Sequence, residues 1–228
     1  MKEKIKRIAK RLRERCALWY NWDSFHGTYE YVGFLKYLWK QVFHCFPNKR
    51  YYPVDKNSTV CGNIVVGRNS KVTQRGGCYV QGWGKVFIGD YVTVTQNCII
   101  VSSNHLLTNH LEHTYKETII GDHCWIASNS FIGAGVVLGP RTVVAAGSVV
   151  TKSFPDGYCL IGGNPAKVLK EIPKEDFIPR VEKHPMYGYI PETKFKEYLC
   201  NNWNGISFEY DLSTITSNSL LVDFFGKK

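Results

Sequence analysis

Three histidines of this 228-residue chain, His105, His110 and His113, stand close together in the sequence. An imidazole with an unperturbed pKa of about 6.5 can take a proton from a hydroxyl group at neutral pH. A lone histidine is usually structural, but these three lie where a regular repeat is interrupted. A histidine at the start of an inserted loop is a candidate for chemistry, and the elements around it must position it.

The segment from residue 120 to residue 155 divides into six-residue units that each begin with an aliphatic side chain. The aliphatic residues are Ile120, Ile126, Ile132, Leu138, Val144 and Val150. The second place of the unit holds glycine, alanine or threonine, and the fifth place holds small residues until Phe154. A fixed period of this kind is the sequence signature of a repeat architecture.

These hexads predict an all-β core that is a left-handed parallel β-helix. An aliphatic residue every sixth position lies on one flat side of a triangular prism, and three sides close a coil of eighteen residues. Stacked coils pair their backbones about 4.8 Å apart, so roughly five coils give a stack of about 24 Å. We expect the small fifth-place residue to fit near the corner and the second-place glycine or alanine to permit the sharp bend. A β-sandwich, the alternative, would show no rule for the fifth place.

The repeat is interrupted twice. Residues 78 to 85 shift its phase by four residues, and the pattern returns at Ile88. Residues 106 to 119 then separate the hexad at Ile100 from the hexad at Ile120. An irregular segment of that length inside a regular solenoid is more often functional than accidental, so we predict a loop there with His105 at its mouth.

Composition narrows the functional classes. The apolar fraction of 44% is sufficient for a packed core, and no run reaches the eighteen apolar residues of a membrane-spanning helix. The eight cysteines are scattered without paired spacing, which indicates free thiols, and the charged start argues against an export signal. The net charge is +10, but residues 1 to 15 hold eight basic and two acidic residues, so a nucleic-acid surface is not predicted. We therefore expect a cytoplasmic protein.

The ends of the chain lack the repeat. Residues 1 to 20 and 31 to 46 have apolar stripes typical of amphipathic helices. We interpret residues 1 to 59 as a helical cap over the open first coil; peripheral contact of residues 1 to 46 with the inner face of a membrane is the alternative. Residues 60 to 170 form the predicted β-helix domain. Residues 171 to 228 are predicted to be an irregular, aromatic-rich extension that wraps the last coil or a neighbouring chain.

Several motifs together give the chain a resemblance to a known family. They are Asn104-His105, the loop, Ile120-Gly121-Asp122-His123-Cys124-Trp125-Ile126, Ala145-Ala146-Gly147-Ser148-Val149-Val150-Thr151-Lys152 and Gly163-Asn164-Pro165-Ala166-Lys167. Over residues 60 to 170 the chain resembles the hexapeptide-repeat acetyltransferases, and most of all their sugar O-acetyltransferase branch. The resemblance implies a homotrimer whose active sites lie between adjacent prisms and use acetyl-CoA.

The resemblance also implies roles for individual residues. The family's catalytic histidine is the first one where the loop leaves the coil, which matches His105; Asn104 or a backbone carbonyl would hold its other ring nitrogen. His110 and His113 remain alternatives. The positions that match cofactor-binding residues of the family are Trp125, Ser128, Ala146, Thr151, Lys152, Lys167 and Lys170. The lysines would meet the phosphates of the nucleotide.

One departure from the family leaves the acceptor open. The acceptor-binding asparagine of the galactoside enzymes would fall near Arg75, where this chain has Arg75-Gly76-Gly77. A metal enzyme on the same prism, similar to the γ-class carbonic anhydrases, is the first alternative, since His105 and His110 have the spacing of two of their zinc ligands. A catalytic zinc needs three protein ligands, and no histidine stands at the third position, near Arg68-Asn69-Ser70. We therefore predict no metal.

The sequence thus predicts an acetyl-CoA-dependent O-acetyltransferase that acts on a sugar hydroxyl, of a surface polysaccharide or its precursor, by direct attack with His105 as general base. An N-acetyltransferase of an amino sugar or antibiotic keeps the chemistry and changes the acceptor. A non-catalytic β-helix scaffold is the alternative from another functional class. Neither the sugar nor the hydroxyl is specified by the sequence.

Overall fold

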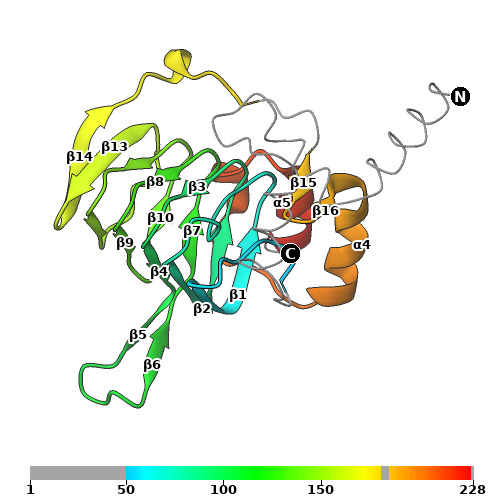
Figure 1. Ribbon diagram of the computed structural model, residues 1–228, viewed down its shortest axis with the longest axis horizontal. Helices are drawn as coiled ribbons and strands as arrows, with labels where there is room; N and C mark the ends of the chain where they lie inside the picture. The colour runs from blue at the N-terminus through cyan, green and yellow to red at the C-terminus, as the bar shows by residue number, and fades with distance from the viewer. Residues whose placement is uncertain (1–49, 181–184, 227–228) are drawn as a thin grey trace, which may run out of the picture.

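The computed structural model describes residues 50–180 and 185–226 of the chain. The helices predicted over 1–20 and 31–46, and the membrane contact predicted for 1–46, lie outside these residues. Within the described part, the chain forms the predicted left-handed parallel β-helix of about five coils (Figure 1). None of the helices in the described part is long and apolar enough to cross a membrane.

The coils have three faces. The first face stacks the leading parts of β1 (Thr59–Val66) and β2 (Tyr79–Ile88), then β4 (Ile99–Val101), β9 (Phe131–Ile132) and β12 (Val149–Val150). The second stacks the trailing parts of β1 and β2, then β7 (Thr118–Ile120) and β10 (Val137–Leu138). The third stacks β3 (Thr93–Val94), β8 (Trp125–Ile126), β11 (Val143–Val144), β13 (Cys159–Gly163) and β14 (Ala166–Glu171), the last of which is antiparallel.

The predicted aliphatic columns are confirmed. On the first face Ile100 pairs with Ile132 and Ile132 with Val150, and each is fully buried. The other two faces carry equivalent columns, which run through Ile120 and Ile126. Because each strand has only two or three residues in most coils, its partners are residues of the coils above and below. The core is therefore one continuous apolar column.

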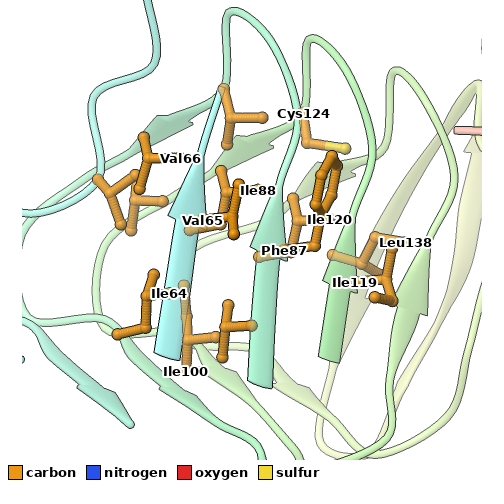
Figure 2. Close-up of a cluster of buried hydrophobic side chains, with 14 of the residues drawn as sticks. Ile64, Val65, Val66, Phe87, Ile88, Ile100, Ile119, Ile120, Cys124 and Leu138 are labelled. Atoms are coloured by element: carbon orange, nitrogen blue, oxygen red, sulfur yellow. The ribbon is translucent and has the colours of Figure 1, made fainter. Parts of the chain in front are cut away.

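The second face is buried on both sides at the end of β2 and at β7. The strands of the other faces alternate between buried and partly exposed residues, whereas all three residues of β7 are buried. Phe87 and Ile119, neighbours of the inward residues Ile88 and Ile120, are themselves fully buried (Figure 2). The ring of Phe87 meets that of Phe208 at 5.5 Å. A later part of the chain therefore covers this face from outside.

The bend at each corner comes from the fourth place of the hexad, and our assignment of the bend to the second place is wrong. The fourth-place residues have positive φ angles; they are Asn69, Tyr91, Asn97, His123, Asn129, Gly135, Arg141 and Gly147. The second-place glycines are small for another reason. A Cβ on Gly139 would lie 2.0 Å from the carbonyl oxygen of Pro155 in the next coil. The second place thus sets how closely coils can stack.

The small fifth-place residues are buried as predicted, and they also form hydrogen bonds at the corners. The hydroxyls of Ser130, Thr142 and Ser148 donate to second-place carbonyls three residues earlier, at 2.6–2.8 Å. The thiols of Cys98 and Cys124 lie 3.2 Å from second-place carbonyls of the next coil. Small polar side chains therefore satisfy carbonyl groups that the sharp bend turns inward. The six cysteines of the described residues are free thiols.

The interruption predicted over 106–119 begins and ends earlier. The chain leaves the third coil as an antiparallel ribbon, β5 (Ser103–His105) and β6 (His113–Tyr115). Thr118 and Ile119 are back in the prism and fully buried. Figure 1 shows the ribbon projecting from the coils on its own. The predicted loop missed the first strand because Ser103, Asn104 and His105 fill the last three places of the hexad that starts at Ile100.

The C-terminal extension is not irregular: it starts against the last coil, where the amide of Ile172 donates to the carbonyl of Tyr158, and then covers the first coil. It contains η1 (Lys174–Asp176), β15 (Met186–Tyr187), β16 (Ile190–Pro191), α4 (Glu192–Asn202), η2 (Leu212–Thr214) and α5 (Ser219–Phe225). After β14 it returns along the prism (Figure 1), and Phe195 of α4 packs against Tyr51 at 5.1 Å. The Tyr51 hydroxyl donates to the carbonyl of Val66 in the first coil.

Two carboxylates at the corner between the second and third faces hold the extension. Asp122 accepts hydrogen bonds from the amide and hydroxyl of Ser217 and from the amide of Asp90. Asp90 accepts from Asn218 and pairs with Arg68 at 2.9 Å. Burial and the neighbouring Asp122 charge raise the pKa of Asp90 to about 6. The third place of these hexads is thus an anchor that joins the extension to two coils.

A column of fourth-place side chains supports the strap, the segment 172–180 that follows β14 and contains Phe177. The ring of His123 stacks on Tyr91 at 4.9 Å and meets Phe177 of the strap at 5.2 Å. The guanidinium of Arg141 lies over the ring of Phe177. Burial, and next the positive charge of Arg141, lower the pKa of His123 to about 4.

Stacking distance predicts different costs for two second-place glycines. Gly139→Ala should lower the free energy of unfolding by at least about 2 kcal/mol, because its Cβ would meet backbone atoms that cannot move separately. Gly133→Ala is the matched control: its Cβ would come no closer than 3.3 Å to another atom, so a change below about 1 kcal/mol is expected. Urea unfolding measures both, and equal losses would contradict this account of the second place.

The lowered pKa of His123 predicts a pH-dependent contribution to stability. Between pH 4 and 6.5 the unfolded chain binds a proton that the folded chain does not, so the contribution of His123 to the free energy of unfolding rises with pH. His123→Asn removes this titration and retains a residue that tolerates positive φ. The stability difference, wild type minus variant, should grow by on the order of 1 kcal/mol across that range, allowing for partial exposure.

Asp90 contributes the opposite slope, because its raised pKa makes the folded chain bind the extra proton between about pH 4 and 6. It is present in both proteins and cancels in their difference. Urea unfolding at half-unit steps of pH tests the expectation, which fails if the difference stays constant with pH.

Candidate active site

The β5–β6 ribbon carries all three candidate histidines and is anchored on the second coil. The side-chain carbonyl of Gln81 accepts a hydrogen bond from Ser103, and the hydroxyl of Ser102 accepts one from the amide of Gly84. A Cβ on Gly84 would lie 2.2 Å from the carbonyl oxygen of Ser102. The phase shift near residues 78–85 therefore has a structural purpose: it brings backbone of the second coil beneath the base of the ribbon.

His105 is exposed, and the backbone holds one side of its ring. Its Nδ1 lies 2.6 Å from the carbonyl oxygen of His110. A carbonyl can only accept, so Nδ1 carries the proton and Nε2 is left with a free lone pair. The ring of His113 lies 4.2 Å from that of His105 and restricts it from a second side. This tautomer is the one that a general base requires.

Asn104 does not hold the His105 ring. It pairs with Thr114 across the ribbon, and its backbone carbonyl accepts a hydrogen bond from the Thr114 hydroxyl at 3.4 Å. Of the two ways of holding the ring that the sequence left open, the structure has the backbone carbonyl. The ribbon can supply it because residues 106–112 turn the chain back toward the ring.

The predicted cofactor residues fall into groups on different edges of the prism. Ser128 and Ala146 lie one above the other at the corner between the third and first faces, where the amide of Gly147 donates to the carbonyl of Ser128 at 2.9 Å. The hydroxyl of Ser128 also bonds that of Thr95 at 3.0 Å, so it is positioned by the coil below. Ala146 is exposed and leaves the corner uncovered.

The remaining cofactor residues lie at the far end of the stack or on the third face. Thr151 and Lys152 are exposed at the corner of the last coil between the first and second faces. Lys167 and Lys170 are exposed on β14, opposite Gly162 and Leu160. Trp125 is 54% exposed on the outer side of the third face, between Thr93 and Val143.

Within one chain, the structure does not bring His105 together with most of these residues. His105 leaves from one edge of the first face, whereas Ser128 and Ala146 lie along its other edge. The outer side of the face between them is an apolar row in which Tyr79 pairs with Ile99 and Ile99 with Phe131. Ile99 is 39% exposed. Within one chain, His105 and the edge that carries Ser128 and Ala146 therefore lie on opposite sides of the first face.

Sequence reasoning missed an aromatic cluster beside the histidines. The ring of Trp83 packs edge-on against His113 at 5.2 Å, and Tyr115 lies alongside His113 at 6.3 Å. Trp83 is 48% exposed and Tyr115 61% exposed. The signal was present in the phase shift at Gly82-Trp83-Gly84, which we read as an irregularity of the repeat. No group of three potential metal ligands occurs within the described residues.

A family model supports the identification of the repeat. Residues 117–152 match the model described as "Bacterial transferase hexapeptide (six repeats)". This segment covers the β7 to β12 coils, where the period of six residues is unbroken.

Relatives of known name match the same region. The chain is 34% identical over 89 residues to "Putative colanic acid biosynthesis acetyltransferase WcaF" of Escherichia coli K12, covering 39% of this chain and 48% of the relative. It is 35% identical over 95 residues to the galactoside O-acetyltransferase of the same organism, covering 40% and 46%. The chain thus spans about half the length of these curated relatives.

Among solved structures, a hexapeptide-repeat-containing acetyltransferase from Vibrio cholerae, complexed with acetyl coenzyme A, superposes with a TM-score of 0.48. It is 23% identical and covers 71% of this chain and 86% of that chain. The chain therefore carries hexapeptide repeats over residues 117–152 and is similar, over about half of their length, to proteins named as acetyltransferases.

Proposed function

We propose that this chain is an acetyl-CoA-dependent O-acetyltransferase in which His105 is the general base and a sugar hydroxyl is the acceptor. The observation that carries the proposal is the hydrogen bond from His105 Nδ1 to the carbonyl of His110, which leaves Nε2 free to accept a proton. The matched relatives are named as acetyltransferases, and one of them acts on galactosides. Acetyl-CoA would supply the acetyl group as a thioester.

In each reaction cycle His105 accepts one proton and then gives it back. Nε2 removes the proton from the acceptor hydroxyl as its oxygen attacks the thioester carbonyl carbon. The carbonyl of His110 faces the Nδ1 proton throughout and stabilises the positive charge that the ring acquires. When the carbon–sulfur bond breaks, the ring returns the proton to the departing sulfur. The products are an acetyl ester and the free thiol, and His105 is neutral again.

The described residues fit an extended cofactor along one edge of the prism. Ser128 and the exposed Ala146 give a narrow, small-residue corner, along which the amides of a pantetheine arm can bond to coil backbone. The exposed lysines at 152, 167 and 170 lie toward the last coil, where a phosphate-bearing end would be attracted. Trp125 remains a predicted contact near the thioester.

We infer that the active form is a homo-oligomer, with a trimer as the predicted state. In one chain His105 and the Ser128 edge flank opposite sides of the first face, so a complete site needs the ribbon of one copy and the corner of another. The apolar row through Ile99 provides a surface for such contact. The cytoplasmic location and peripheral membrane contact remain predictions.

An O-acceptor is favoured over an amine by the charges near His105. An amine must lose a proton before it attacks, and a carboxylate close to the base would help to bind its charged form. Glu112, on the ribbon, is engaged by Asn109 at 2.9 Å, and Glu117 is paired with Lys85 at 2.7 Å. Hydroxylamine cleaves an acetyl ester and leaves an acetyl amide intact, so treatment of the product distinguishes the two.

Replacement of His105 tests the proposed base. His105→Ala should lower kcat by about 10²–10⁴-fold, since general-base catalysis contributes that much, and should leave the Kd for acetyl-CoA nearly unchanged. Release of CoA thiol measures turnover, and isothermal titration measures binding.

Two variants serve as controls for the neighbouring histidines. His110→Ala keeps the backbone carbonyl that holds His105, and His113→Phe keeps a ring beside it. Each should retain activity within about tenfold of wild type, far above the His105 variant. Loss of turnover in His110→Ala with full activity in His105→Ala would assign the base to His110. Equal loss of binding and turnover in His105→Ala would indicate misfolding.

A further inference from the structure

A groove of about 690 Å³ runs along the outer side of the second face, between the ribbon and the C-terminal extension. Its near wall is formed by Trp83 and Tyr115, and Tyr210 of the extension forms its far wall. The predicted cofactor residues lie at other edges of the prism, and none of them lines this groove. Its volume lies within the range of small-molecule sites in proteins.

Two residues that line the groove, Trp83 and Tyr115, contact the histidine cluster. Trp83 packs edge-on against His113 at 5.2 Å, and His113 in turn lies 4.2 Å from His105. Tyr115 is on the same strand as His113 and also meets its ring. A ligand unit that touches Trp83 and Tyr115 is therefore one ring away from the imidazole that would take the proton.

The polar floor is held rigid and is internally neutralised. Lys85 pairs with Glu117 at 2.7 Å and donates to the carbonyl of Ser207 at 2.6 Å. The second carboxylate oxygen of Glu117 accepts the amides of Glu209 and Tyr210 at 2.8 and 3.1 Å. Thus one ion pair fixes the far wall to the coil. Because the positive charge of Lys85 is neutralised by Glu117, the floor of the groove can offer hydrogen-bonding groups to an uncharged ligand.

The side chains that form the walls of the groove indicate which class of ligand it can bind. Trp83 and Tyr115 expose large ring surfaces to water. A pyranose ring presents carbon–hydrogen groups on its face and hydroxyls on its edge, so it can stack on such rings while it bonds to polar groups beside them. An added peptide strand does not fit, because the strands beneath are already paired from β1 through β2 and β7 to β10.

We infer that this groove binds the sugar units that flank the acetylated one, so that the acceptor is an oligosaccharide or polysaccharide chain and not a free monosaccharide. The inference rests on the proposed function for its assignment of the reacting unit to His105. Chain binding in the groove is a property of Trp83, Tyr115 and Tyr210 and does not require turnover. The C-terminal extension then has a role in acceptor selection, because it supplies one wall.

Direct binding tests the inference without acetyl-CoA. The probes are glucose, galactose and N-acetylglucosamine, each as the monosaccharide and as its hexasaccharide, titrated into the full-length protein. At least one hexasaccharide should bind ten or more times more tightly than its monosaccharide. Trp83→Ala should remove that gain. The absence of a gain from chain length in all three series overturns the inference.

A matched control separates the groove from general loss of tryptophan. Trp125→Ala removes a side chain of similar exposure from the third face, and chain binding in the absence of acetyl-CoA should remain within about twofold of wild type. Equal loss in the Trp83 and Trp125 variants, or full binding by Trp83→Ala, contradicts the assignment. Circular dichroism shows that each variant is folded.

The His105→Ala variant distinguishes failure of this inference from failure of the proposed function. It should bind the hexasaccharide as wild type does while it loses turnover. If wild type binds chains through Trp83 yet transfers no acetyl group to them, the proposed reaction fails and the binding site stands. If it acetylates the monosaccharide and the chain with equal kcat/KM, the reaction stands and the groove assignment fails.

Discussion

The structure depends on the pairing of each coil with the next. Strands of two or three residues cannot form sheet by local contacts, and each obtains its hydrogen bonds and its buried neighbours from coils about eighteen residues away. Stacking distance is therefore fixed everywhere at once, which is why a second-place Cβ at Gly139 would collide with backbone. A solenoid of this kind has apolar ends that must be covered. Among the described residues, the C-terminal extension covers the first coil.

The cover is joined to the coils by polar contacts as well as apolar packing. Asp90 and Asp122 occupy the same corner of successive coils, and residues 217 and 218 reach both of them. Burying two carboxylates side by side has a cost, seen in the raised pKa of Asp90, and Arg68 and the amide donors offset it. These contacts fix the extension relative to the coils, so Tyr210 can form a wall beside Glu117. The anchoring of the extension by Asp90 and Asp122 thus positions Tyr210 in the wall of the groove.

The sequence was sufficient to predict the prism, because its aliphatic period reports burial directly. Ile120, Ile126 and Ile132 all lie in the core where their spacing placed them. It was insufficient for the bend, since positive φ at the fourth place is compatible with side chains as different as Tyr91, His123 and Arg141. Asn97 and Asn129 were the available hint, because asparagine tolerates that conformation.

The C-terminal extension could not be predicted for a different reason. Its contacts are long-range: Asn218 reaches Asp90, and Phe208 reaches Phe87. No local period in residues 171–228 records where a partner lies, so nothing in this segment indicated that it would cover the first coil. The sequence of that segment lacks repeats, yet the segment has regular structure, as α4 and α5 demonstrate.

Departures from the repeat proved as informative as the repeat itself. The shift at Gln81 to Lys85 and the insertion that carries His105 occur at the same corner of adjacent coils, where Gly84 and Ser102 are in contact. A run of unbroken hexads gives no loop that could hold an imidazole ring through a backbone carbonyl, as the insertion after His105 does. The insertion is supported at its base by the departure in the coil before it. In a solenoid, a functional site can be built where adjacent coils depart from the hexad pattern at the same corner.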